Sequence, residues 1–186
     1  MDFKSKFDSG FSYSQFLEKY GSDTDTMKWK SVHELVNLSS DQKDLLSGFV
    51  RQMNVLVMAG AWCGDCVSQV PILDHFENAT DKITIRYVDR DADAELAEEL
   101  KICGGSRVPQ MVIMSEDFLP VSRDGDRTLS RYRQMAQQQF GSGCPTGLGL
   151  GDDPVFAEVV QDWIDIFERA QLIMRLSPSL RQRHGD

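Results

Sequence analysis

Two cysteines separated by two residues give this chain its clearest candidate for chemistry. Cys63 and Cys66 follow a short apolar stretch and begin a segment whose apolar residues have helical spacing. A thiol at a helix N-terminus faces unpaired backbone N–H groups and the positive end of the helix dipole, and both favour the thiolate. Because a thiolate attacks disulfides, and a second thiol one turn away can displace the mixed disulfide, the pair predicts dithiol–disulfide exchange. We expect Cys63 to attack and Cys66 to resolve.

Half of a zinc site is the main alternative for such a pair. A zinc site needs two more ligands, which Cys103, Cys144 or His75 could supply. None of these three residues belongs to a second knuckle with metal-ligand spacing, so the redox interpretation is favoured. It requires no bound cofactor or metal, because the reversible Cys63–Cys66 disulfide carries the electrons.

The elements around the cysteine pair alternate between strands and helices. Compact apolar runs and β-branched alternation predict the strands, while apolar residues at helical spacing predict the helices. In chain order we expect a strand over residues 54–59, a helix over 71–78, a strand over 82–89, a helix over 92–101, and strands over 110–114 and 118–122. This order is typical of an α/β protein with a mixed sheet.

The first fifty residues are predicted to be helical. A serine three residues before Gln or Glu has capping-box spacing, and this occurs at Ser12, Ser31 and Ser39. Apolar residues between these positions predict helices that pack on a neighbouring sheet.

Helices are expected at the other end as well. Residues 127–140 form a polar helix candidate, followed by a glycine-rich loop. Asp153 and Pro154 suit the start of a long C-terminal helix, as an N-cap with proline at the first helical position. Residues 177–186 are expected to be a frayed tail.

Composition limits the partners. The chain has 186 residues, enough for one well-cored domain, and its net charge of −9 argues against nucleic acid or an anionic membrane as the main partner. Residues 1–10 lack the apolar core of a secretory signal, and the longest apolar run has the length of a buried strand. We therefore expect a cytoplasmic protein without a membrane partner.

Two segments resemble the thioredoxin family. Residues 58–71 contain Trp62, the cysteine pair and Pro71 five residues beyond Cys66, as in the thioredoxin active site. Val108-Pro109, placed between a predicted helix and a predicted strand, resembles the family's cis-proline loop. The Gly104 to Pro109 sequence, Gly-Gly-Ser-Arg-Val-Pro, together with the helical extension, is similar to a thioredoxin-like subgroup in which some members lack the second cysteine.

The resemblance implies a thioredoxin fold, in which a central mixed β-sheet has helices on both faces. To this the chain adds N-terminal helices and a long C-terminal helix. We expect a helical extension over residues 1–53, a thioredoxin-like core over 54–140, and a loop, helix and tail over 141–186, all within one domain.

The resemblance also implies a substrate site around Cys63. Its predicted members are Trp62, Gly64, Asp65, Arg107, Val108 and Pro109. Pro109 would be cis and the Val108 backbone would pair with an extended substrate segment. Trp62 would shield the disulfide, and Arg107 is either a solvated loop charge or a contact for an acidic partner. The implied partners are a disulfide-containing protein or a small-thiol substrate, and an electron-donating reductase or thiol.

The sequence departs from the thioredoxin pattern beside the cysteines. Val57 stands where thioredoxins have a buried aspartate, and Asp65 stands where thioredoxin has proline. A carboxylate at Asp65 should oppose thiolate formation, although it could also accept the proton of Cys66. Cys103 is expected to be a packed thiol, while Cys144 could form a third redox partner if its loop covers the site.

Two alternatives from other classes remain open. The chain could be a non-catalytic binding or scaffold module that keeps the thioredoxin fold, as the missing aspartate suggests. It could also be a metal-binding protein that uses Cys63 and Cys66. The intact cysteine pair favours the enzyme.

Overall fold

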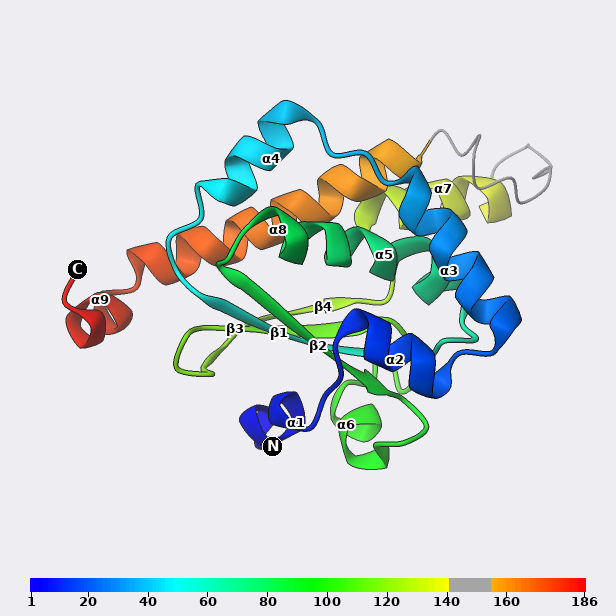
Figure 1. The fold of residues 1–186 in the computed structure, drawn as a ribbon, viewed down its shortest axis with the longest axis horizontal. Helices are drawn as coiled ribbons and strands as arrows, with labels where there is room; N and C mark the ends of the chain where they lie inside the picture. The colour runs from blue at the N-terminus through cyan, green and yellow to red at the C-terminus, as the bar shows by residue number, and fades with distance from the viewer. Residues whose placement is uncertain (141–154) are drawn as a thin grey trace.

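The computed structural model describes residues 1–140 and 155–186. Its centre is a mixed four-stranded sheet in the order β2-β1-β3-β4 (Figure 1). Strand β1 (Met53–Ala59) pairs in parallel with β2 (Ile83–Asp89) and antiparallel with β3 (Gln110–Met114), which pairs antiparallel with β4 (Pro120–Gly125). Every residue of β1 and β3 is buried, as expected for central strands that are covered on both faces.

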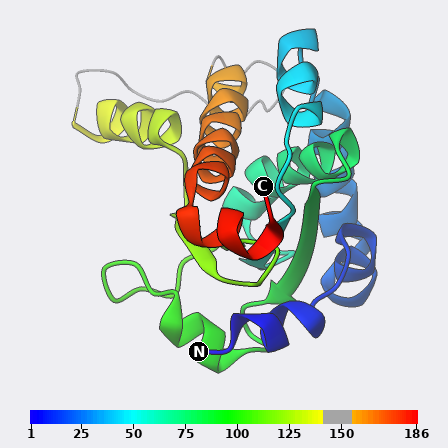
Figure 2. The ribbon, with the colours of Figure 1, turned by 90° about the vertical axis from the view of Figure 1, so that its left-hand side faces the viewer.

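Helices cover both faces of this sheet. Helices α5 (Gly64–Ala79) and α8 (Phe156–Leu176) lie on one face, while the short helices α1 (Phe3–Asp8) and α6 (Ala94–Glu99) lie on the other (Figures 1 and 2). Helix α7 (Leu129–Phe140) packs beside α8. The predicted α/β fold with helices on both faces and a long C-terminal helix is therefore confirmed.

Aromatic packing joins the two long helices above the sheet. The rings of Phe76 in α5 and Phe167 in α8 meet edge to face, with centroids 5.3 Å apart, and both side chains are fully buried. Such pairs combine a large buried apolar area with a favourable quadrupole geometry.

The N-terminal helices pack outside this core. They are α2 (Tyr13–Tyr20), α3 (Asp23–Leu35) and α4 (Ser40–Ser47). Helix α3 lies along α5, and α4 contacts both α5 and α8. Phe11 exchanges two backbone hydrogen bonds with Tyr87 of β2, at 2.8 and 2.9 Å, so the extension also covers the free edge of the sheet.

Two of the three predicted capping boxes are confirmed, at Ser12 and Ser39. The third prediction, at Ser31, is wrong, because α3 already begins at Asp23 with a capping box formed by Ser22 and Asp25. Ser31 lies inside that helix, where its hydroxyl donates to the Met27 carbonyl at 2.9 Å.

The end of the chain also differs from expectation. The predicted frayed tail contains helix α9 (Pro178–His184), which Ser177 caps and Leu180 anchors in the core. The side chain of Asp186 pairs with the buried Arg51 at 2.5 Å. The predicted helix start at Asp153 and Pro154 lies outside the described residues.

Strand β4 begins later than predicted. Phe118 adopts a positive φ of 59°, and the Ser115 hydroxyl accepts hydrogen bonds from the backbone of Asp117 and Leu119, so this segment turns. The strand follows at Pro120. In the described part of the chain, no helix has the length and apolarity needed to cross a membrane.

Candidate active site

The cysteine pair lies where β1 ends and α5 begins. Three loop residues follow Ala59, and Cys63 is the N-cap residue of α5. A Cβ at Gly60 would lie 2.8 Å from the Trp62 indole, so glycine is what lets this ring lie against the backbone. The indole N–H of Trp29, in α3, donates to the Ala61 carbonyl at 2.8 Å. The N-terminal extension thus helps to hold the loop that carries the cysteines.

Cys63 has the environment of a nucleophile. It is half-buried, and it approaches Cys66 to 3.8 Å. The pKa of Cys63 is lowered to about 6, first by the hydrogen bond from the Cys66 thiol and then by the backbone N–H groups of Cys66 and Asp65. Partial burial and the charge of Asp65 act in the opposite direction but do not prevail. At neutral pH a thiol with this pKa is roughly nine-tenths ionised.

Cys66 has the opposite character. It is fully buried, and its sulfur accepts a hydrogen bond from the Gly60 N–H at 3.5 Å. Burial, followed by its hydrogen bond to Cys63, raises the pKa of Cys66 well above the ordinary value. The pair therefore consists of an accessible thiolate and a hidden, protonated thiol, and neither sulfur is in a disulfide.

The Val108-Pro109 segment lies against Cys63. The peptide bond between these residues is cis, and in its thiol form Cys63 donates to the Val108 carbonyl across 3.6 Å. The Val108 side chain is buried. The structure therefore brings together two segments that are more than forty residues apart.

Trp62 and Gly64 flank Cys63 on its open side. The Trp62 side chain is 52% exposed, and the Arg90 guanidinium lies 4.5 Å from the centre of its ring. Nothing lies within 4 Å of the position that a Cβ at Gly64 would take. These two residues leave an apolar surface and open space beside the nucleophile.

Asp65 is held in an ion pair that sequence reasoning missed. Its two carboxylate oxygens accept hydrogen bonds from the Arg127 Nε at 2.9 Å and from Nη2 at 2.5 Å. The charge of Asp65 does raise the pKa of Cys63, as predicted, but by less than burial does, and the hydrogen bonds to Cys63 outweigh both. The partners are 62 positions apart, which leaves no local spacing signal, so the pairing could not be read from the sequence.

A buried carboxylate continues this network. Asp126 is 3% exposed in its side chain and accepts from Arg127 at 3.1 Å, from Arg107 at 3.3 Å and from the hydroxyl of Tyr132. Burial alone would raise the pKa of Asp126, but the hydrogen bond from Tyr132 and the nearby guanidinium groups lower it. Arg107, predicted as a solvated charge or a partner contact, thus has Asp126 as its partner.

The remaining sequence candidates lie away from this arrangement. Cys103 is exposed at a tight turn with a positive φ of 50°, so the prediction of a packed thiol is wrong. Val57 is fully buried in β1. Cys144 lies outside the described residues. Within the ranges that the structure describes, no three His, Cys, Asp or Glu side chains are arranged to hold a metal ion.

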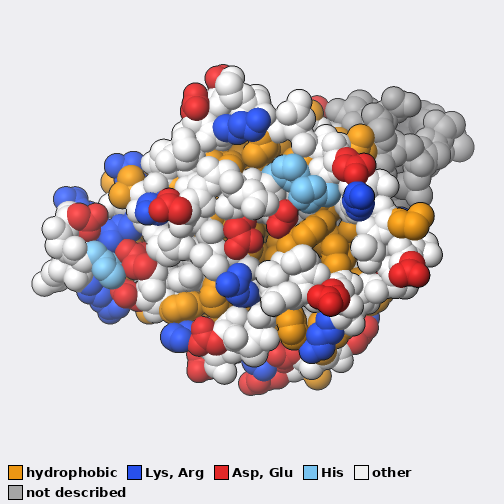
Figure 3. Space-filling model, in the orientation of Figure 1, with side chains coloured by type: hydrophobic (Ala, Val, Ile, Leu, Met, Phe, Trp, Pro, Cys, Tyr) orange, Lys and Arg blue, Asp and Glu red, His pale blue; other side chains and the backbone are white. Residues whose placement is uncertain are grey.

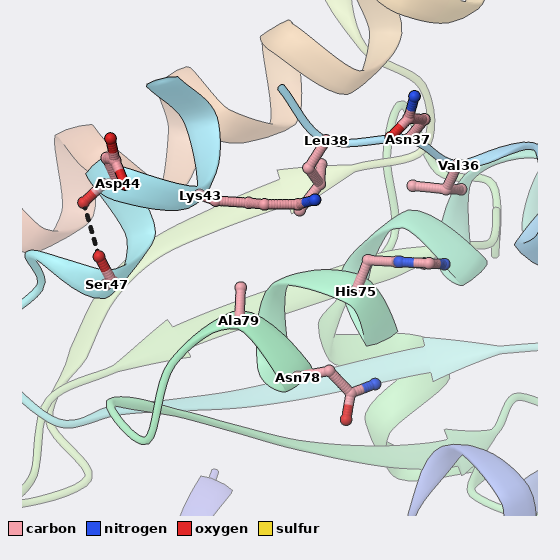
Figure 4. Close-up of a pocket in the computed structure, with 9 residues that line it drawn as sticks. All are labelled: Val36, Asn37, Leu38, Lys43, Asp44, Ser47, His75, Asn78 and Ala79. Atoms are coloured by element: carbon pink, nitrogen blue, oxygen red, sulfur yellow. Dashed lines mark hydrogen bonds between the residues drawn. The ribbon is translucent and has the colours of Figure 1, made fainter. Parts of the chain in front are cut away.

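A hollow lies at the other end of α5. It has a volume of about 520 Å³ and is lined by residues of the α3–α4 connection, α4 and α5, including Lys43, His75 and Asn78 (Figure 4). Histidine side chains gather on this face beside hydrophobic surface (Figure 3). The imidazole Nε2 of His75 lies 3.0 Å from the His33 carbonyl, and its ring is 4.1 Å from the His33 ring. None of the three cysteines that the structure describes lines this hollow.

Comparisons with solved structures agree with the fold. A protein of unknown function from Pseudomonas aeruginosa superposes with a TM-score of 0.72 at 19% identity, covering 91% of this chain and 99% of its own. A crystallised HIV epitope-scaffold protein gives a TM-score of 0.69 at 19% identity, with the same coverage of both chains. At this identity the likeness describes the fold alone.

Sequence comparison identifies the family. No curated protein matches the chain. The family model described as thioredoxin matches residues 10–128, which include the cysteine pair, the Val108-Pro109 segment, Asp126 and Arg127. The chain therefore belongs to the thioredoxin family.

Proposed function

We propose that this protein is a thiol–disulfide oxidoreductase with Cys63 as its nucleophile and Cys66 as its resolving thiol. One observation carries the proposal, namely that adjacent environments drive the pKa values of two cysteines 3.8 Å apart in opposite directions. Perturbed groups of this kind are characteristic of functional sites. A structural cysteine pair has no need for an accessible thiolate.

In the first step, the Cys63 thiolate attacks one sulfur of a substrate disulfide. A Cys63–substrate S–S bond forms, the substrate S–S bond breaks, and its departing sulfur leaves as a thiolate. The lost negative charge at Cys63 removes one cause of the high pKa of Cys66, because the two thiols are coupled.

In the second step, Cys66 gives its proton to the departing substrate thiolate and attacks the Cys63 sulfur. The Cys63–Cys66 bond forms, the mixed disulfide breaks, and the second substrate thiolate takes a proton from solvent. The Gly60 N–H stabilises negative charge on Cys66 during this attack. The protein has lost two electrons and the Cys66 proton, solvent has supplied the second proton, and the substrate disulfide has become two thiols.

The surrounding residues fit a groove for the substrate. Trp62 supplies exposed apolar surface, Gly64 leaves open space, and the Val108-Pro109 backbone borders the sulfur. Arg107, whose side chain is 47% exposed, directly precedes Val108, and Asp65 lies between the two cysteines. We assign these residues to binding of a disulfide-containing protein or a small disulfide.

A complete cycle needs an electron donor. A flavin-dependent reductase or a small thiol would return the Cys63–Cys66 disulfide to the dithiol, and no bound cofactor is required. Reduction of substrates suits a reducing cytoplasm, which we propose as the compartment.

The test is the reduction potential of the Cys63–Cys66 pair, measured by equilibration in dithiol redox buffers with Cys63→Ser as the control. A reversible two-electron transition near about −270 mV, the value for thioredoxin, supports a reductase. The absence of a reversible transition in the folded protein overturns the proposal and favours a binding module.

A further inference from the structure

The sequence between the cysteines contains an apparent conflict. Asp65 adds a carboxylate next to Cys63, and a nearby negative charge disfavours ionisation of a thiol. Cys63 nevertheless has a lowered pKa, because its hydrogen bonds outweigh burial and the charge of Asp65. The contacts of the Asp65 carboxylate show what limits the effect of that charge.

Arg127 is placed to do so. It lies between the end of β4 and the start of α7, and its guanidinium meets both oxygens of Asp65 in a two-pronged contact of 2.5 and 2.9 Å. The side chains are 20% and 29% exposed, so solvent screens the pair only partly. Paired guanidinium–carboxylate bonds of this geometry fix both partners and are stronger than neutral hydrogen bonds.

The other side of Arg127 is fixed as well. Its Nη1 donates to Asp126 at 3.1 Å, and the backbone carbonyl of Asp126 accepts from the buried Gln69 amide at 3.0 Å. Gln69 belongs to α5, the helix that begins at the cysteines. The guanidinium is therefore held from both sides and has little freedom to leave Asp65.

We propose that Arg127 is a positioning residue for thiol–disulfide exchange, which clamps Asp65 and neutralises its charge so that an aspartate can stand between the cysteines without suppressing the Cys63 thiolate. This inference rests on the proposed function and deepens it. The clamp also engages both oxygens of Asp65, and the adjacent guanidinium makes the carboxylate a weaker proton acceptor for Cys66.

The test compares the pH dependence of Cys63 alkylation in the full chain and in four variants. In Arg127→Gln, the unpaired carboxylate should raise the pKa of Cys63 by about one unit. In Asp65→Asn, the pKa should stay unchanged or fall. The double variant should return to the value of Asp65→Asn, because Arg127 acts only through Asp65.

Arg123→Gln is the matched control. It removes the same unit charge from neighbouring β4, where Arg123 pairs with Glu99 at 2.7 Å, and it should leave the pKa of Cys63 unchanged. A general effect of net charge would appear equally in both arginine variants.

Two results would overturn the inference. One is a folded Arg127→Gln protein with the wild-type pKa at Cys63, and the other is a double variant as shifted as Arg127→Gln alone. If Arg127→Gln does not fold, Asp65→Asn still tests the inference, since a raised pKa of Cys63 in that variant would contradict neutralisation of Asp65 by Arg127. Alkylation needs no turnover, so failure of the clamp and failure of the oxidoreductase are seen separately.

Discussion

The two ends of helix α5 differ in what they offer a ligand. The N-terminal end has two thiols in opposite environments. Three segments from elsewhere in the chain contact Cys63 or residues beside it, namely Trp29 of α3, the Val108-Pro109 loop and Arg127. The C-terminal end has the hollow, yet the Nε2 of His75 lies within hydrogen-bonding distance of the His33 carbonyl, and burial lowers the pKa of His75. The hollow and the two thiols therefore lie at opposite ends of one helix.

The difference follows from the helix itself. Its N-terminus presents unpaired backbone N–H groups that stabilise an anion, and these groups act directly on the sulfur of Cys63. The C-terminal end has no such donors, and its polar side chains hydrogen-bond one another, as Asn78 does with Asp74 at 3.0 Å. Reactivity depends on oriented donors more than on the size of a cavity.

The largest expected effect is a loss of disulfide reduction that occurs only for changes at the N-terminal end of α5. Cys63→Ser should abolish reduction of a model protein disulfide, a loss of more than about a thousandfold, because it removes the thiol whose pKa is lowered. Cys66→Ser should retain the attack and accumulate a mixed disulfide, which mass spectrometry detects. His75→Asn is the control at the other end and should keep the activity within about twofold. Equal losses in both cysteine and histidine variants would contradict the contrast.

The second effect is a pH dependence. Since the pKa of Cys63 is lowered to about 6, its alkylation rate should rise about tenfold per pH unit below 6 and level off above 7. An ordinary thiol would still be gaining thiolate at pH 8. Cys66 should resist alkylation until the protein unfolds, because it is buried. A Cys63 rate that keeps rising to pH 8.5 would argue against a site that stabilises the thiolate.

The third effect concerns the extension. Trp29→Phe removes the hydrogen bond to Ala61, whereas Trp163→Phe, also in the core, removes an indole N–H that has no hydrogen-bond partner among the described residues. Both variants lose the same volume, so Trp29→Phe should cost about 1 kcal/mol more in unfolding free energy. Urea denaturation measures the difference. We also expect only Trp29→Phe to change the alkylation rate of Cys63, and equal rates would show that α3 does not hold the active-site loop.

The smallest expected effect comes from a substitution beside the C-terminal end of α5. Lys43→Ala changes a residue that lines the hollow. It should alter the unfolding free energy by no more than about 0.5 kcal/mol and leave disulfide reduction unchanged. A marked loss of reduction in this variant would show that the two ends are coupled through the helix.

Local patterns predicted most of the elements correctly. Strand β3 and the capping boxes at Ser12 and Ser39 were predicted at their observed positions, because periodicity and cap spacing involve neighbouring residues. The same local logic misplaced a helix start at Ser31, where a true capping box upstream at Ser22 had already begun the helix. It also missed helix α9, whose residues contact distant parts of the chain, as Arg183 does with Asp117 at 3.1 Å.

The sequence by itself determined the cysteine pair, their order and their place at the start of a helix, since these depend on a few adjacent residues. Only the tertiary structure decided that Arg127 pairs with Asp65, that Trp29 donates to Ala61 and that Val108 borders Cys63. These contacts join residues 62, 32 and 45 positions apart. They carry no periodic signal, because only the packing of helices and loops around the sheet brings such partners within hydrogen-bonding distance.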